Sequence, residues 1–137
     1  TFESGTGSTP SDWTVSGSAA YRDGNTPYSG AWKGVHYGSS AYEVLTSQTL
    51  TGLTPGRTYT LTAQVAGSGG QVAAGMGLKN CGDGVDHWVD LAAVGTSWTQ
   101  RQASVTMPSG STSCLVYFYS KTTTSGRWLS FDNVVVN

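Results

Sequence analysis

Two carboxylates stand close to opposite ends of the chain, each beside apolar residues. Glu3 follows Phe2 in the opening stretch FESG and is one of only two glutamates in the sequence. Asp132 lies in the closing stretch SFDNVVVN, which is otherwise largely apolar. A carboxylate directed into a packed interior costs free energy unless a cation meets it. We therefore expect the two ends of the chain to meet over a bound metal ion.

The remaining acids are too few for most hydrolytic chemistry. A glycoside hydrolase needs two carboxyl groups at a defined separation across a cleft. The sequence has only eight Asp and Glu residues in total, and two of them are already candidates for metal binding. Asp83 and Asp86 in CGDGVDHW lack the full pattern of an Asp-rich calcium loop, so a turn is the simpler interpretation. We therefore expect no catalytic residues.

Histidine and cysteine residues form no catalytic or zinc motif. His36 and His87 are the only histidines, and no GxSxG stretch accompanies either of them. A zinc site that combined them with Cys81 and Cys114 would lack the short ligand spacings of structural zinc sites. Both histidines are interpreted as polar residues of strands.

Composition excludes further classes of protein. Charged residues make up 11% of the chain and the net charge is -1, so no basic patch is available and we expect no nucleic-acid partner. No apolar run approaches the roughly 18 residues of a membrane span, so we expect no membrane partner. Five Trp, seven Tyr and three Phe supply enough apolar surface to argue against disorder. The chain begins at Thr1 rather than Met, which suggests a module of a larger protein.

Period-two alternation runs through most of the chain, and no helical period accompanies it. In the segment RTYTLTAQVAG, for example, Tyr59, Leu61, Ala63 and Val65 alternate with Thr and Gln residues. Strands are expected at 31–38, 41–50, 57–67, 71–80, 87–94, 100–108, 114–121 and 127–137. Turns rich in Gly, Pro, Asn and Ser separate them. This spacing predicts one all-β domain over residues 1–137, an antiparallel two-sheet β-sandwich of jelly-roll type.

The two cysteines can be placed on these strands. If 71–80 and 114–121 are antiparallel neighbours, Cys81 and Cys114 lie at the same end of the sheet, within reach of a disulfide. In a cytosolic protein the two thiols would instead be buried apolar groups. Few Lys and many Ser, Thr, Gly and Tyr residues are typical of exported proteins, so we expect the disulfide and a secreted, extracellular location.

Six motifs occur in an order that is shared with one group of proteins. They are FESG, SDWTVSG, YSGAW, LTGLTPGRTYTLTAQV, TSWTQRQASVTM and FDNVVV, and they run over essentially the whole chain. The chain thereby resembles the β-sandwich carbohydrate-binding modules of bacterial polysaccharide-degrading enzymes, most similar to families four, nine and twenty-two. The resemblance implies non-catalytic binding of a polysaccharide or oligosaccharide and tethering to a catalytic domain.

The same resemblance implies a structural calcium ion (Ca²⁺) near the meeting of the first and last strands. Members of the group hold this ion with the Glu of a motif like FESG and the Asp of a motif like FDNV. On this sequence those residues are Glu3 and Asp132. The chemistry agrees, because calcium prefers six to eight hard oxygen ligands and two carboxylates with backbone carbonyls suit it.

Sugar binding needs aromatic rings that stack on the C–H face of a pyranose, together with polar groups for its hydroxyls. Trp88 shares a strand face with Asp90, and Tyr117 and Tyr119 share the face opposite Val116 and Phe118. The expected stacking or groove residues are Tyr42, Trp88, Tyr117 and Tyr119. The expected hydrogen-bonding partners are Asn80, Asp90, Gln64 and Lys121, with His36 and Tyr37 closing one edge and Trp128 as a residue carried by a loop.

Two alternatives from other classes remain open at this stage. One is a lyase or hydrolase domain, which the scarcity of acids and bases disfavours, and the other is a spacer module. The stretch LTGLTPGRTYTLTAQV also resembles a fibronectin-like spacer module that binds no sugar. Such domains have near 100 residues, and the FESG and FDNV motifs have no place in them. The sequence does not choose between β-glucan, xylan, mannan, galactan and uronic-acid polymers as the ligand.

Overall fold

All 137 residues are described by the computed structural model, which contains strands and no helix. No element is therefore a long apolar helix of the kind that crosses a membrane. The twelve strands are β1 Gly5–Thr6, β2 Thr9–Pro10, β3 Thr14–Ser16, β4 Ala20–Asp23, β5 Lys33–Tyr37, β6 Tyr42–Leu50, β7 Thr58–Gly67, β8 Ala73–Lys79, β9 His87–Asp90, β10 Thr99–Thr106, β11 Cys114–Thr122 and β12 Trp128–Val136. The eight strands expected from the sequence correspond to β5 through β12.

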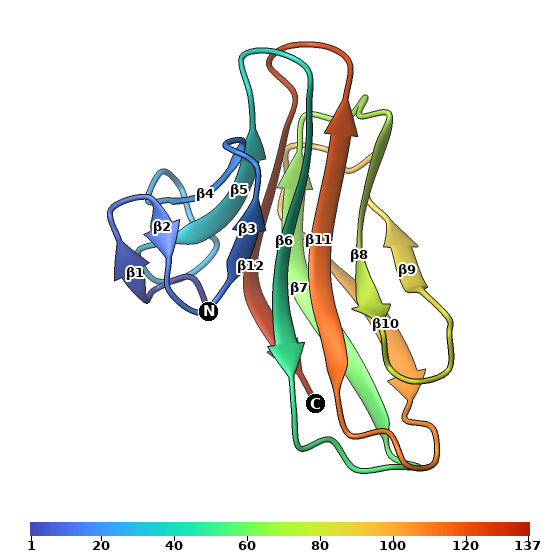
Figure 1. Ribbon diagram of the computed structural model, residues 1–137. Coiled ribbons are helices and arrows are strands. Elements are labelled where there is room, and N and C mark those ends of the chain that lie inside the picture. The colour runs from blue at the N-terminus through green and yellow to red at the C-terminus, as the bar shows by residue number, and fades with distance from the viewer.

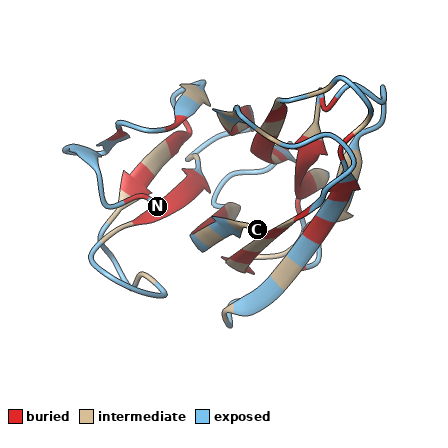
Figure 2. Ribbon diagram, turned by 90° about the horizontal axis from the view of Figure 1, so that it is seen from below, coloured by how far each residue is buried: buried red, intermediate tan, exposed pale blue.

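The strands form two five-stranded antiparallel sheets that pack face to face (Figure 1). Sheet 1 has the order β3-β6-β11-β8-β9, and sheet 2 has the order β10-β7-β12-β5-β4. The hairpin β1-β2 lies beside them. Buried positions concentrate on the strands, whereas the connecting loops are mostly exposed (Figure 2). The predicted all-β sandwich is confirmed.

Alternation along the strands separates the core from the outer faces. On β7 the residues Tyr59, Leu61, Ala63 and Val65 are all buried, while the intervening Thr and Gln side chains are at least partly exposed. Because successive side chains of a strand point to opposite faces, each sheet carries one apolar inner face and one more polar outer face.

Aromatic stacking in the interior ties the two sheets together. The rings of Phe118 on β11 and Phe131 on β12 are nearly parallel, with centroids 4.0 Å apart. Phe2 packs edge-on against Phe131 at 5.3 Å and stacks on Trp13 at 4.9 Å, so the first residues of the chain fill the space beside the last strand. Each such side chain contributes roughly 1.5–3 kcal/mol on burial. The expected meeting of the chain ends is therefore present as an aromatic contact.

The disulfide between Cys81 and Cys114 is confirmed. Strands β8 and β11 are antiparallel neighbours, with Lys79 opposite Leu115, which brings the two Cα atoms to 4.4 Å. The cross-link closes a separation of 33 residues. In the chain-entropy model, such a closure stabilises the fold by about 3–4 kcal/mol.

The sequence pattern did not predict the short strands β1 to β4. They contain two to four residues each, too few for a period to show. A buried arginine holds this segment in place: the Arg22 guanidinium donates to the carbonyls of Gly7 and Glu3, both at 2.8 Å, and lies 4.1 Å over the Trp32 ring. These tertiary contacts take the place of a long hydrogen-bonded ladder.

His36, expected to close one edge of a groove, instead lies wholly between the sheets. Its ring nitrogens are 2.8 Å from the Ser120 hydroxyl and 2.9 Å from the Thr46 hydroxyl, and the ring meets Phe131 edge-on at 4.9 Å. His36 is buried because it stands opposite Leu129 of β12, and cross-strand partners point to the same side of a sheet, here inward. Complete burial lowers the pKa of His36 to about 3.

The depressed pKa of His36 predicts acid sensitivity. The imidazole stays neutral in the folded protein down to about pH 3, whereas the unfolded chain binds a proton near pH 6.5. The contribution to stability is therefore complete above pH 6.5 and is lost as the pH falls toward 3. We expect about 3 kcal/mol of this contribution to disappear between pH 7 and pH 4.

Denaturant unfolding of the wild type and of His36→Gln across this pH range measures the effect. The variant should show a shallower loss of unfolding free energy, whatever its stability at pH 7. NMR signals of the His36 ring in the folded wild type should stay unchanged from pH 7 to pH 4. A ring that titrates near pH 6 would contradict the prediction.

Candidate functional site

An aromatic cluster lies on the outer face of sheet 1. Trp88 of β9 pairs with Gly77 of β8, and Tyr117 and Tyr119 of β11 stand opposite Gly77 and Gly75. The Trp88 ring is 6.2 Å from that of Tyr117 at 25° and 6.3 Å from that of Tyr119 at 57°. Trp88 is 40% exposed, whereas Tyr117 is only 2% exposed beneath its neighbours. Trp88 thus forms the solvent-facing surface of the cluster.

A missing side chain on β8 makes room for the Trp88 ring. A Cβ atom placed on Gly75 would lie only 2.2 Å from that ring, so the indole occupies the space above the β8 backbone. At Gly77 a Cβ would lie 2.5 Å from the carbonyl oxygen of His87 and 3.0 Å from the Tyr117 hydroxyl. The two glycines allow β9 and its tryptophan to close over the sheet.

Carboxylates hold the two tyrosine hydroxyls. The Tyr117 hydroxyl donates to Asp86, and the Tyr119 hydroxyl donates to Glu43 Oε1 at 2.7 Å. Lys121 Nζ approaches the other oxygen of Glu43 at 3.7 Å. Burial, followed by the hydrogen bond to Glu43, raises the pKa of Tyr119 to about 12. Burial and the hydrogen bond to Asp86 also raise the pKa of Tyr117. Both phenols therefore stay protonated donors at neutral pH, and both carboxylates keep free acceptor positions.

A shallow cavity of about 220 Å³ opens beside the cluster. It is lined by Leu45, Lys79, Asp86, Trp88, Tyr117 and Tyr119. The Lys79 ammonium lies 4.5 Å over the Tyr117 ring. Lys79 and Asp86 both line the cavity, so a cationic donor and a carboxylate acceptor border it. Aromatic faces, hydrogen-bond donors and hydrogen-bond acceptors thus lie on one surface.

The structure brings five of the expected binding residues to this face: Trp88, Tyr117, Tyr119, Asp90 and Lys121. Asp90 accepts a hydrogen bond from the Ala92 amide at 2.8 Å. Asn80 follows β8 directly and has a left-handed backbone, with φ of 56°. It therefore belongs to the turn at the end of the face rather than to the face itself.

Other expected residues lie elsewhere. Gln64 of β7, Tyr37 of β5 and Trp128 of β12 are on the outer face of sheet 2. Tyr42 shares its β6 face with the inward-pointing Val44, and its hydroxyl donates to the Arg127 carbonyl at 2.9 Å. Burial raises the pKa of Tyr42 to about 12. These positions do not join the Trp88 cluster.

Several residues of the face were not among those expected. Glu43, Lys79, Asp86 and Leu45 were missed, although Glu43 alternates with the apolar Tyr42 and Val44. The clearest signal is GMG within β8, because two glycines at alternate positions of a strand indicate that another group lies over that face.

Glu3 and Asp132 hold one and the same loop. Asp132 Oδ2 accepts from the Ser29 amide at 2.9 Å, and Glu3 Oε1 accepts from the Ala31 and Trp32 amides at 3.2 and 3.3 Å. Asp132 is only 3% exposed, and none of the three ion pairs of the structure includes it or Glu3. A buried carboxylate without a cationic partner converges here with a second carboxylate on the same loop.

Comparisons with solved structures find proteins of the same fold. The solved structure of TmCBM61 in complex with beta-1,4-galactotriose has a TM-score of 0.73 and 16% identity, over 93% of this chain and 88% of that one. The C-terminal family 22 carbohydrate-binding module of Clostridium thermocellum Xyn10B has a TM-score of 0.64 and 21% identity, over 93% and 86%. These likenesses show a shared fold.

A longer protein contains the same fold as one part. The arabinose-bound MgGH51 α-L-arabinofuranosidase has a TM-score of 0.68 and 13% identity, over 98% of this chain but only 25% of that one. No curated protein matches the sequence. A family described as "Carbohydrate binding domain", which comprises the modules of families four and nine, matches residues 1–126. Because this match spans nearly all of the 137 residues, the chain belongs to that family of carbohydrate-binding modules.

Proposed function

We propose that the protein binds a polysaccharide chain across the outer face of sheet 1, with Trp88 as the main stacking residue. The observation that carries this proposal is the 40% exposed Trp88 ring, packed against Tyr117 and Tyr119 in the space that Gly75 leaves free. A pyranose presents a flat C–H face to such a ring, and burial of both surfaces stabilises the complex.

The polar groups beside the ring supply the directional contacts. Glu43 and Asp86 are held by tyrosine hydroxyls and keep acceptor positions for sugar hydroxyls, while Lys79 and Lys121 donate. Tyr117 is covered by its neighbours and acts as support beneath Trp88. Because these groups lie on hydrogen-bonded strands, little ordering is needed on binding.

The ligand class is a neutral, β-linked polysaccharide. Opposite charges are paired on this face, as Lys121 with Glu43, so no uncompensated cationic patch favours a polyanion. Among proteins of the same fold, one was solved with beta-1,4-galactotriose and another is described as a xylan-binding domain. Galactan, xylan and β-glucan are therefore the polymers to test first.

The module itself is proposed to be non-catalytic and to be tethered to a catalytic domain. Glu43 and Asp86 are both engaged by tyrosine hydroxyls, an arrangement that positions carboxylates for binding. In the arabinofuranosidase the same fold forms a quarter of a longer enzyme chain. Tethering raises the effective concentration of an attached enzyme at its substrate. Secretion is proposed from the disulfide, which persists in oxidising compartments.

A structural calcium ion is proposed for Glu3 and Asp132. The donor chemistry fits, because two carboxylates converge on the loop from Ser29 to Trp32, and the buried Asp132 has no other cation. When bound, calcium would neutralise these carboxylates and tie the first residues of the chain to β12.

Replacing Trp88 tests the binding site. Trp88→Ala removes the exposed ring, so we expect affinity to fall by about 1–3 kcal/mol, the scale of losing one aromatic anchor. The affinity is measured by electrophoresis in gels that contain β-1,4-galactan, xylan or mixed-linkage β-glucan. The melting temperature serves as a control for folding. Retardation of the variant equal to that of the wild type would place the site elsewhere. A wild type that no polymer retards would favour a spacer module.

A second variant displaces the ring without deleting it. Gly75→Ala introduces a Cβ that would lie 2.2 Å from the Trp88 ring, so the indole must move away from β8. We expect most of the loss seen for Trp88→Ala. Gly95→Ala is the matched control, because a Cβ there meets nothing within 4 Å. Equal binding by Gly75→Ala and Gly95→Ala would show that the ring position is unimportant.

Chelation tests the metal. With calcium at 100 times its Kd, the wild type should be more stable than in EDTA by about 2.7 kcal/mol, seen as a lower melting temperature in EDTA. Asp132→Asn should abolish this difference, whereas the exposed Asp12→Asn should retain it. Identical melting of the wild type in EDTA and in excess calcium would refute the site.

A further inference from the structure

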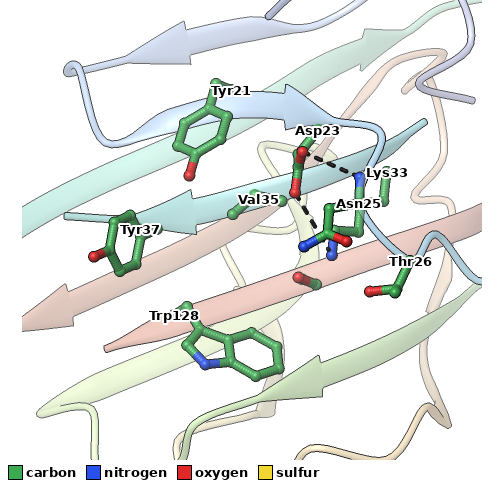
Figure 3. A pocket seen from close by; sticks show the side chains of 9 residues that line it. Tyr21, Asp23, Asn25, Thr26, Lys33, Val35, Tyr37 and Trp128 are labelled. Carbon is green, nitrogen blue, oxygen red and sulfur yellow. Dashed lines mark hydrogen bonds and ion pairs between the residues drawn. The ribbon is translucent and has the colours of Figure 1, made fainter. Parts of the chain in front are cut away.

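A second group of aromatic residues lies on the opposite outer face of the sandwich. Trp128 of β12 and Tyr37 of β5 are direct cross-strand partners on the outer face of sheet 2. Tyr21 of β4 points to the same side, since it pairs with Val35. The three rings surround Val35 (Figure 3). None of these side chains takes part in the site proposed on sheet 1.

The three rings border a cavity of about 260 Å³. Tyr37 is 41% exposed, and Tyr21 and Trp128 are partly exposed. This volume is near the lower end for small-molecule sites and suits one or two sugar rings. An aromatic side chain in this position does not contribute to the core, because the core of the sandwich lies on the other side of sheet 2.

Polar groups occupy the far side of the cavity from Tyr37 and Trp128 (Figure 3). Lys33 Nζ is 3.8 Å from Asp23 Oδ2, and the backbone N–H of Asn25 donates to Asp23 Oδ1 at 3.1 Å. The Lys33 side chain is only 9% exposed. The ammonium and carboxylate compensate each other, so the cavity offers donors and acceptors without a net charge. This chemistry suits hydroxyl groups better than phosphates or carboxylates.

Tyr21 adds a neutral phenol to the lining of the cavity. Burial, with the Asp23 carboxylate and Tyr37 nearby, raises the pKa of Tyr21 above its usual value. Its hydroxyl therefore remains a donor at neutral pH. The cavity thus combines three rings with a carboxylate, an ammonium and a phenol, the mixture that a pyranose requires.

The surface continues past Tyr37 into a second hollow of about 320 Å³. This hollow lies between Ser18–Ala19 and Gly38–Tyr42, and Tyr37 lines both spaces. Its walls are rich in serine hydroxyls and backbone groups. A chain that stacks on Tyr37 therefore finds room for sugar units on both sides of the ring.

Hydrogen bonds hold the backbone around Trp128 at the start of β12. The Trp128 amide donates to the Ser68 hydroxyl at 3.0 Å, and the Trp128 carbonyl accepts from Gln71 Nε2 at 2.8 Å. Gln71 is buried. A fixed backbone on both sides of Trp128 and a paired strand under Tyr37 reduce the entropy cost of binding.

We propose that the outer face of sheet 2 is a second saccharide-binding site, with Tyr37 and Trp128 as stacking residues and with Asp23, Lys33 and Tyr21 as hydrogen-bonding groups for one or two neutral pyranose units. The site is independent of the one on sheet 1, since the two lie on opposite faces of the sandwich. Two sites on one module raise the apparent affinity for a polymer without any new contact at either site.

NMR titration distinguishes the two sites directly. The indole N–H signals of Trp88 and Trp128 are followed in ¹H–¹⁵N spectra of the wild type and of Trp88→Ala. The probes are β-1,4-galactotriose, xylotetraose and cellotetraose. We expect a saturable shift of the Trp128 signal with at least one probe in both proteins.

Each outcome decides a point. A Trp128 signal that no probe moves in the wild type overturns the second site. If the Trp88 signal alone responds, the second site is refuted and the proposed function on sheet 1 stands. If Trp128 alone responds, the second site holds and the proposed role of Trp88 fails. If neither responds, both are refuted.

Variants of Tyr37 test the stacking itself. Tyr37→Ala should raise the Kd obtained from the shift of the Trp128 signal at least fivefold. Tyr37→Phe keeps the ring and should bind as the wild type does. Tyr37 is 41% exposed, so neither change removes core packing. Equal binding by Tyr37→Ala and Tyr37→Phe would overturn the proposed role of the ring.

Discussion

The contact between Phe118 and Phe131 determines which side chains reach solvent. Their parallel rings, 4.0 Å apart, fix the inner face of β11 against the inner face of β12. Because strand side chains alternate, Tyr117 and Tyr119 must then lie on one outer face and Trp128 on the other. A slip of one residue in either strand would bury what is exposed and expose what is buried. Both proposed binding surfaces therefore depend on the core packing.

Few charges are present, and the fold gives the buried ones specific partners. Arg22 binds backbone carbonyls and covers Trp32, so it stabilises the N-terminal segment without a carboxylate. His36 is kept neutral between two hydroxyl groups. Asp132 accepts hydrogen bonds from the backbone amides of Ser29 and Asn133. Polar groups buried in this way are tolerable because each finds hydrogen-bond partners, and they make the packing of loops on sheet 2 specific.

Alternation in the sequence was sufficient for the eight expected strands and for the shared outer face of Tyr117 and Tyr119. The disulfide followed only on the assumption that β8 and β11 are neighbours, and the contact of Trp88 with the two tyrosines came from the structure. Alternation did not predict side-chain orientation where apolar residues occupy both odd and even positions of a strand. In the stretch AYEVLTS both Val44 and Leu45 are apolar, so the pattern does not say that Tyr42 points inward. Nor does it reveal that Tyr117 is covered, because that depends on Trp88 from β9, 29 positions earlier (117 − 88 = 29). Such effects arise from strand order, which periodicity does not encode.

Small residues on strands determine where a flat surface can form. On sheet 1 the side chains missing from Gly75 and Gly77 let a ring lie over the backbone of β8, so Trp88 is supported from below and cannot turn inward. On sheet 2 the cross-strand pair beside Tyr37 and Trp128 on the same face is Val35 with Ser130, which are also short and line the same cavity. In both places aromatic rings lie beside short side chains on neighbouring strands, and a cavity opens beside the rings. A sandwich with bulky side chains throughout its outer faces would have the same core and no such hollow.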